Sequence, residues 1–256
     1  SSRNLVDHIW ADQPQPPVGK ISPYPIEYAG QSHDEKRARI AADLVAACQT
    51  AAVLTLPDSI AWLLNIRGAD VANTPIAHAF AIVGETGHVE LFTAPGKAAG
   101  LERHFGSGVS LAEPEAFTAA LGTLSGPVRV DKGSAPLAVS TILQDAGIEI
   151  AYAADPCRLP KACKTATELD GCRAAHLRDG AAVVRFLAWF DRADTSRLSE
   201  IDIVTRLETY RAATNLLHDI SFDTISGSGP HGAVVHYRVT EKSNRPLDRD
   251  SLLLVD

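Results

Sequence analysis

The chain lacks methionine entirely, and position 1 is Ser1. It also lacks an excess of basic residues, with 24 Lys and Arg against 31 Asp and Glu and a formal net charge of −7. A nucleic-acid-binding domain normally presents a basic face, so this balance argues against one. No apolar run approaches the ~20 residues of a membrane-spanning helix, and no signal peptide opens the chain. We expect no nucleic-acid or membrane partner, and a cytoplasmic location.

Cysteine is scarce as well. The four cysteines lie far apart or at spacings unlike the common zinc patterns: Cys48, Cys157, Cys163 and Cys172. Cys157 and Cys163 could pair or share a metal. Free thiols in a reducing compartment are the simpler interpretation.

Hydrophobic residues make up 45% of the 256 residues, which is enough to form a buried core. This length suggests roughly two domains. Residues 1–29 are rich in proline and show no periodicity, which predicts a linker from a preceding domain. Residues 30–157 alternate expected helices (34–49, 57–64, 96–105, 114–124, 136–146) with expected strands (52–56, 78–83, 89–92, 128–130, 148–151). That alternation predicts a compact α/β domain.

Residues 158–256 follow a proline-containing boundary. A long helix is expected from a cap at Thr167, with an apolar stripe of Leu169, Cys172, His176, Val183, Val184, Leu187 and Phe190. A second helix is expected from Ser199, with acidic residues in its first turn. The chain ends on the apolar run 251–256, which predicts a buried strand. Because termini normally lie in exposed segments, we expect this chain to be an internal piece that continues past Asp256.

The stretch 221–237 contains three glycines between two strand-like segments. A glycine turn followed by an apolar strand predicts a hairpin, since glycine adopts backbone conformations that other residues resist. In this hairpin His236 would leave the second strand beside the aromatic Tyr237. On its own, such a histidine is weak evidence of catalysis.

Four stretches, in order along the chain, carry a family resemblance: Asn4-Leu5-Val6-Asp7 with Trp10; Asp58 to Gly68; Lys164 with Glu168 to Gly171, His176 and Asp179-Gly180; and Ser221-Phe222 through His236-Tyr237. They resemble the aminopeptidase P branch of the pita-bread metallopeptidases, over essentially the whole chain. The stretch 58–68 is characteristic of the three-domain type. The implied fold is α/β: a creatinase-N-like middle domain at 30–157, followed by the first part of an α+β pita-bread catalytic domain at 158–256.

The resemblance implies hydrolysis of Xaa-Pro bonds at the N-terminus of peptide substrates. It gives His236 a catalytic and substrate-binding role at the scissile bond and makes Asp256 the first of five ligands to two divalent metal ions. Manganese is expected, with zinc or cobalt possible. The other four ligands have no counterpart in this sequence, so the 256 residues alone are expected to bind no metal and to be inactive. Family members commonly form homodimers. His231 stands where relatives usually carry Asn and is not assigned a catalytic role.

Two alternatives stay open. The same fold could catalyse another reaction, such as dipeptide or creatine hydrolysis. The chain could also be a non-catalytic binding module that has lost the metal site. Arg67, Arg238 and His176 are weaker candidates for contacts at a site, and each is more simply explained as a structural residue.

Overall fold

The computed structural model describes residues 5–256. Residues 1–4, which include part of the predicted linker and Asn4 of the first resembling stretch, lie outside the described residues. The chain divides into two compact units, the first ending at Thr165 and the second spanning Ala166–Asp256. Among the described residues, no helix combines the length and apolar character needed to cross a membrane.

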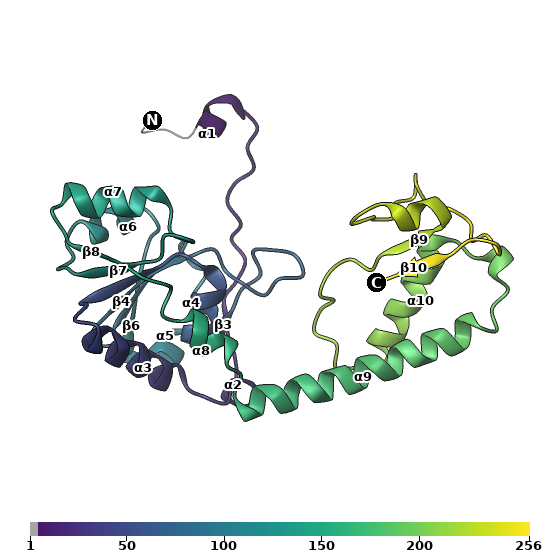
Figure 1. The fold of residues 1–256 in the computed structure, drawn as a ribbon, viewed down its shortest axis with the longest axis horizontal. Helices are drawn as coiled ribbons and strands as arrows, with labels where there is room; N and C mark the ends of the chain where they lie inside the picture. The colour runs from purple at the N-terminus through teal and green to yellow at the C-terminus, as the bar shows by residue number, and fades with distance from the viewer. Residues whose placement is uncertain (1–4) are drawn as a thin grey trace. The chain divides into compact units, whose positions relative to one another are not determined.

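Unit 1 is built on a six-stranded mixed sheet in the order β6-β5-β4-β2-β7-β8 (Figure 1). The strands are β2 (Ala51–Leu54), β4 (Phe80–Gly84), β5 (Val89–Phe92), β6 (Val109–Ala112), β7 (Val128–Val130) and β8 (Ile150–Tyr152). β4 pairs antiparallel with β2 and β5, and the other neighbours are parallel. The expected α/β domain and its five strands are therefore confirmed, and β6 is an additional strand.

Helices cover both faces of this sheet. They are α3 (His33–Ala46), α4 (Pro57–Leu64), α5 (Glu102–Phe105), α6 (Ala116–Leu121), α7 (Leu137–Asp145) and α8 (Arg158–Ala162), with the 3-10 turn η1 (Gly106–Gly108). Strand β2 shows why two layers form. Ala52 and Leu54 enter the core shared with α3 and α4, whereas Ala51 and Val53 enter the core shared with α6 and α7. Successive side chains of a strand point to opposite faces, so a strand covered on both sides reads as a continuous apolar run.

Part of the predicted linker belongs to unit 1. After α1 (Leu5–Ile9), strand β1 (Ser22–Pro23) pairs antiparallel with β3 (Ile66–Arg67), and α2 (Ile26–Ala29) follows. Ile21 is fully buried in the core. The Gly19 N–H donates to Asp70 at 2.9 Å, and the Asp70 carboxylate also forms a buried ion pair with Lys97. Proline-rich composition hid this packing because it removes the periodicity by which strands and helices are recognised.

The division between the units falls after Thr165 rather than after Cys157. Helix α8 remains with unit 1, where it packs on α4, and Lys161 forms an ion pair with Asp58. The buried Cys157 belongs to the same core. The prolines that suggested a boundary at 157 therefore lie in and beside a helix that still contacts unit 1.

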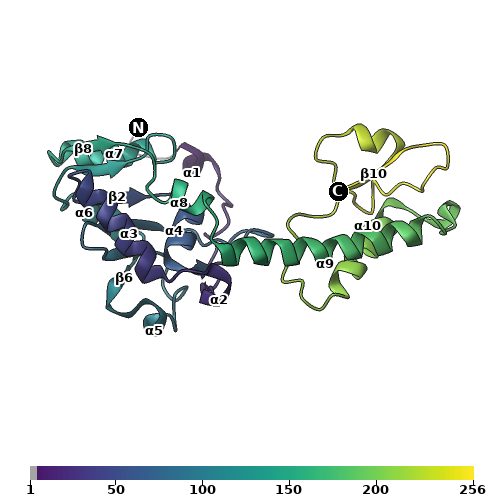
Figure 2. The same cartoon turned by 60° about the horizontal axis from the view of Figure 1, so that its bottom comes forward.

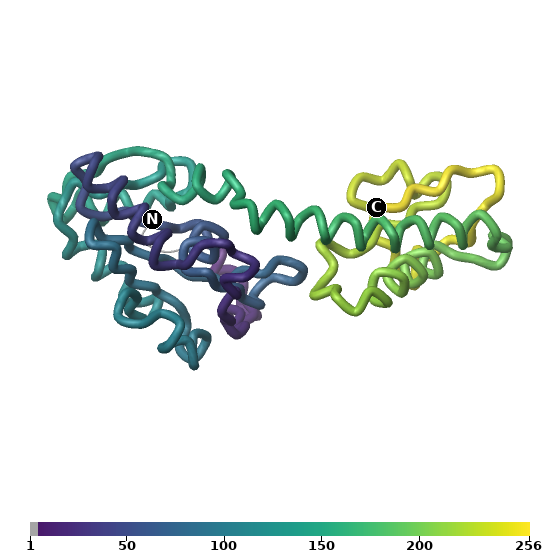
Figure 3. Tube along the Cα trace, turned by 90° about the horizontal axis from the view of Figure 1, so that it is seen from below, coloured from purple at the N-terminus to yellow at the C-terminus, as the bar shows by residue number. Residues whose placement is uncertain are grey.

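Unit 2 contains α9 (Ala166–Phe190), the 3-10 turn η2 (Thr195–Arg197), α10 (Glu200–Ala212), β9 (Ser226–Ser228), the 3-10 turn η3 (Gly229–Ala233) and β10 (Leu253–Val255). Figures 2 and 3 show α9 as one continuous helix. Ser199 precedes α10, and its backbone N–H donates to Asp202 at 2.8 Å, which confirms the predicted helix start. The core of the unit is formed by Phe186, Ile203 and Leu207.

The expected details of α9 are wrong in two respects. The helix begins at Ala166, so Thr167 lies inside it rather than capping it. Its buried residues are Ala182 and Phe186. Val183 and Phe190 of the expected stripe are partly buried against the same core, whereas Leu169, Val184 and Leu187 are 42–64% exposed. Ala182 and Phe186 are each one position before Val183 and Leu187, which corresponds to ~100° of rotation about the axis. Apolar residues on several sides of α9 made that rotation ambiguous from sequence.

Candidate active site

Strands β9 and β10 form a two-stranded antiparallel sheet that fixes the end of the chain. Val255 lies opposite Ser226 and Leu253 lies opposite Ser228. One residue further on, Asp256 and Ile225 exchange two backbone hydrogen bonds of 2.8 and 3.0 Å. The backbone of Asp256 is therefore held on both its N–H and C=O, while its side chain is exposed. This pairing fixes the position of the Asp256 backbone relative to β9.

The predicted hairpin is wrong. β9 does not turn back into a partner strand at 233–237; it runs into η3 and pairs with β10 instead. Pro230 stands at the start of η3, where its fixed φ suits a helical turn. η3 folds back closely on β9, so that a Cβ at Gly227 would lie 2.9 Å from the Gly232 nitrogen. The glycines thus permit this close approach rather than a hairpin turn. The expected burial of the terminal strand is also wrong, because β10 is only partly buried.

His236 lies in a tight turn and not on a strand. The Tyr237 N–H donates to the Val234 carbonyl at 3.2 Å, which makes His236 the third residue of a four-residue turn. Its φ is +54°, in the left-handed region that non-glycine residues seldom adopt. Its side chain is exposed, and no hydrogen bond or ion pair to its imidazole occurs within residues 5–256. An uncommon backbone conformation at an exposed histidine is a feature found at functional sites.

A buried carboxylate, Glu200, holds the chain on both sides of that turn. Glu200 is fully buried and accepts hydrogen bonds from His231 Nδ1 at 2.8 Å and from the Tyr237 hydroxyl at 2.9 Å. It also accepts from the backbone N–H groups of Ser228 at 2.7 Å and Arg245 at 3.1 Å. The aromatic rings of His231 and Tyr237 lie 4.6 Å apart. Glu200 is therefore a positioning residue for the segment that carries His236.

The electrostatics of Glu200 follow from these bonds. Burial alone raises the pKa of its carboxyl, because a charge is costly away from water. The hydrogen bonds from Ser228, His231, Tyr237 and Arg245 outweigh burial and bring the pKa of Glu200 below its usual value. The group is thus held ionised in the folded protein.

Sequence reasoning missed this role of Glu200, which was treated only as an acid favourable to the helix dipole. A signal was present, because Ile203 and Leu207 follow it by three and seven residues. In a helix these positions share one face. An acid on the apolar face of a helix predicts a buried carboxylate that needs several donors.

We expect the Glu200→Gln variant to lower the free energy of unfolding of this chain by about 2–3 kcal/mol at pH 7, because an amide nitrogen would face donors instead of accepting from them. Urea denaturation followed by circular dichroism measures the change. Glu208→Gln, on the same helix, is the matched control and should shift stability by less than about 0.5 kcal/mol.

The difference in stability between the parent and the Glu200→Gln variant should depend on pH. A carboxyl whose pKa is lower in the folded state stabilises the fold above its unfolded pKa, and this contribution is lost as the pH falls through the folded value. The difference between parent and Glu200→Gln should therefore shrink below about pH 4.5. A difference that stays constant from pH 7 to pH 3 would contradict a buried, ionised Glu200.

Two residues near Asp256 have buried hydroxyl groups without a hydrogen-bond partner. The hydroxyl oxygens of Thr224 and Ser226, on either side of its backbone partner Ile225, are buried and have no hydrogen-bond partner within residues 5–256. Within the same range, no three His, Cys, Asp or Glu side chains come together as a group able to hold a metal ion. Asp256 could supply one oxygen ligand, but the described residues do not complete a metal site, and no catalytic step through a metal follows from them. No hydrogen bond or ion pair between described atoms joins His236 to Asp256.

The weaker candidates have structural contacts of their own. The Arg67 guanidinium lies 3.7 Å from the centre of the Tyr24 ring, and Arg238 forms an ion pair with Asp223. His176 is exposed, and its Nδ1 lies 2.9 Å from the Cys172 carbonyl oxygen on the same helix. All four cysteines are free. Burial raises the pKa of the Cys157 thiol well above its usual value, so it is an unreactive core residue.

Comparison with known proteins gives two family matches that follow each other along the chain. Residues 12–168 match the creatinase/prolidase N-terminal domain, and residues 170–256 match metallopeptidase family M24. A Laccaria bicolor protein named "Probable Xaa-Pro aminopeptidase P" is 34% identical over 263 residues, which covers 99% of this chain and 40% of that protein. A protein of the same name from Aspergillus flavus is 33% identical over 269 residues and is covered to 41%.

Among solved structures, the X-prolyl aminopeptidase of Caenorhabditis elegans, described as a cytosolic enzyme with a di-nuclear active site, matches with a TM-score of 0.89 and 28% identity. The match covers 99% of this chain and 43% of that one. The chain thus spans 40–43% of the length of these three relatives.

Proposed function

Since this chain belongs to the creatinase/prolidase N-terminal domain family and continues into a metallopeptidase family M24 segment, we propose that it works as part of an Xaa-Pro aminopeptidase. The enzyme would remove the N-terminal residue from peptides whose second residue is proline. The observation that carries the proposal is the Caenorhabditis elegans neighbour, because a single X-prolyl aminopeptidase accounts for both units of the chain. Xaa-Pro bonds need a dedicated enzyme, since the proline nitrogen carries no N–H and fixes the backbone.

Two residues of unit 2 are assigned to the chemistry. Asp256 would donate a carboxylate oxygen to one metal ion, and His236 would contact the substrate at the scissile bond. The geometry supports both roles, because the backbone of each residue is fixed by neighbouring contacts. A histidine is suited to stabilise a developing negative charge, because its protonation changes near neutral pH.

The active site would be completed by polypeptide outside these 256 residues, in line with the greater length of the relatives. The di-nuclear site of the Caenorhabditis elegans enzyme supports two metal ions per site here. Manganese as the metal, with zinc or cobalt as alternatives, and a homodimeric assembly stay predictions. A cytoplasmic location is supported by the description of the same neighbour as cytosolic.

A pair of peptides that differ only by proline or alanine at the second position tests the proposal. The test uses a longer polypeptide that contains these 256 residues together with the segments that complete the active site. With manganese present, this longer polypeptide should release the N-terminal residue from the proline peptide only, and residues 1–256 alone should cleave neither peptide. Mass spectrometry of the products measures both. Cleavage of Xaa-Pro dipeptides but not of longer peptides would indicate a prolidase-like reaction instead. Peptide binding without cleavage by the longer polypeptide would indicate a binding module.

A further inference from the structure

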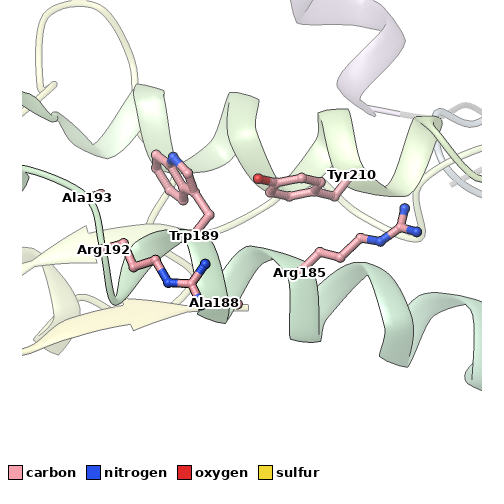
Figure 4. A pocket seen from close by; sticks show the side chains of 6 residues that line it. All are labelled: Arg185, Ala188, Trp189, Arg192, Ala193 and Tyr210. Atoms are coloured by element: carbon pink, nitrogen blue, oxygen red, sulfur yellow. The ribbon is translucent and has the colours of Figure 1, made fainter.

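A pocket of 420 Å³ lies in unit 2, between helices α9 and α10. It is lined by Arg185 and Trp189 of α9, by Arg192 in the turn that follows α9, and by Tyr210 of α10. Figure 4 shows the rings of Trp189 and Tyr210 between the two helices, with the guanidinium groups of Arg185 and Arg192 beside them. The pocket is open to solvent over much of its extent, so a ligand bound here would stay partly exposed.

Helical spacing brings two of the lining residues together. Arg185 and Trp189 stand at i and i+4, which places them on one face of α9. Arg192 lies two residues past the end of the helix, in a turn where its N–H donates to the Trp189 carbonyl at 3.1 Å. The indole of Trp189 is held by neighbouring rings, with Phe186 at 5.8 Å between centroids. On α10, Arg206 places its guanidinium 4.8 Å from the centre of the Trp189 ring. Two arginines and two aromatic rings therefore line the pocket, and a third arginine, Arg206, contacts the Trp189 ring.

These arginines have no acidic partner. Within residues 5–256, Arg185, Arg192 and Arg206 form no ion pair with a carboxylate. Other arginines of the same unit are paired, as in Arg173–Asp170, Arg197–Asp194 and Arg211–Asp179. No carboxylate lines the pocket either. The concentration of positive charge is local, because the chain as a whole carries −7.

We propose that this pocket binds a small molecule that carries phosphate groups on a planar aromatic ring, as a nucleotide does. Guanidinium groups bind phosphate with paired, charge-assisted hydrogen bonds. The rings of Trp189 and Tyr210 would contact the planar part of the ligand, since aromatic side chains stack on nucleobases. The site is separate from His236 and Asp256, and the inference does not depend on the peptidase activity.

Isothermal titration calorimetry of the 256-residue chain tests the proposal with three probes: ATP, inorganic tripolyphosphate and adenosine. ATP should bind about tenfold more tightly than tripolyphosphate, because it adds the ring contact. Adenosine should show no measurable binding. Equal affinity for ATP and tripolyphosphate would overturn the role of the rings, and no binding of ATP at millimolar concentration would overturn the site.

A matched pair of double variants separates the pocket from general charge. Arg185→Gln with Arg192→Gln should weaken ATP binding by about tenfold or more. Arg173→Gln with Arg178→Gln removes the same charge from α9 outside the pocket and should change the affinity by less than about twofold. Equal losses in the two variants would show non-specific attraction and overturn the proposal. Thermal unfolding by circular dichroism checks that both variants remain folded. Trp189→Leu is an independent variant that keeps every charge and should also lose ATP affinity.

Discussion

The Asp256→Asn variant of the longer polypeptide is expected to lose tight manganese binding and to hydrolyse Xaa-Pro peptides about a thousandfold more slowly than the parent. Hard divalent ions prefer charged oxygen ligands, and an amide oxygen replaces the carboxylate without its charge. Metal content by elemental mass spectrometry and steady-state kinetics with added manganese measure the two effects.

The fold should survive this change. The two hydrogen bonds that hold Asp256 to Ile225 use backbone atoms, so they do not depend on the side chain. Asp250→Asn is a suitable control, because Asp250 is an exposed aspartate at the other end of β10. Loss of activity with full metal content would contradict the assignment of Asp256 as a ligand.

The second large effect is expected for His236→Asn in the same longer polypeptide, with a decrease in kcat of roughly 10²–10³-fold and an unchanged metal content. Asparagine is chosen because it tolerates the left-handed backbone that His236 adopts at φ +54°. The variant therefore removes the imidazole while it keeps the turn. Steady-state kinetics with a proline-containing peptide measures kcat and KM separately.

The control for this variant is His218→Asn, which removes an exposed histidine elsewhere in unit 2 and should leave kcat unchanged. If His236→Asn raised KM alone, the histidine would bind the substrate equally in the ground and transition states. If it had no effect on either constant, the role proposed for His236 would be wrong.

Regular periodicity made the sheet of unit 1 predictable. Strand β2 is buried on both faces, and the helix that begins with Pro57 was recognisable because proline suits the first helical turn. The pairing of β9 with β10 was not predictable, because its two strands lie far apart in sequence and each is only three residues long. A glycine-rich turn next to an apolar run suggested local pairing instead. Close packing of η3 on β9 uses the same glycines and leaves no distinguishing pattern in sequence.

The candidate site, like the pairing of β9 with β10, could be predicted only in part from the sequence. His236 and Asp256 were identified through resemblance and not through geometry, and their roles stay predictions. The structure adds their local environments: a left-handed turn for His236 and a paired backbone for Asp256. Glu200 connects β9, η3 and the turn through hydrogen bonds, and such a convergence of distant donors cannot be read from spacing alone.

The pairing of β9 with β10 also imposes an order on biosynthesis. Ser226–Ser228 leave the ribosome well before Leu253–Val255, and in this unit one of the two hydrogen-bonding edges of β9 is paired with those later residues. At ~5–20 residues per second, the intervening segment takes roughly one to five seconds to translate. During that interval the nascent β9 has an open edge, and open strand edges are sites of aggregation. The serines and glycine of β9 expose little apolar surface before β10 has been synthesised.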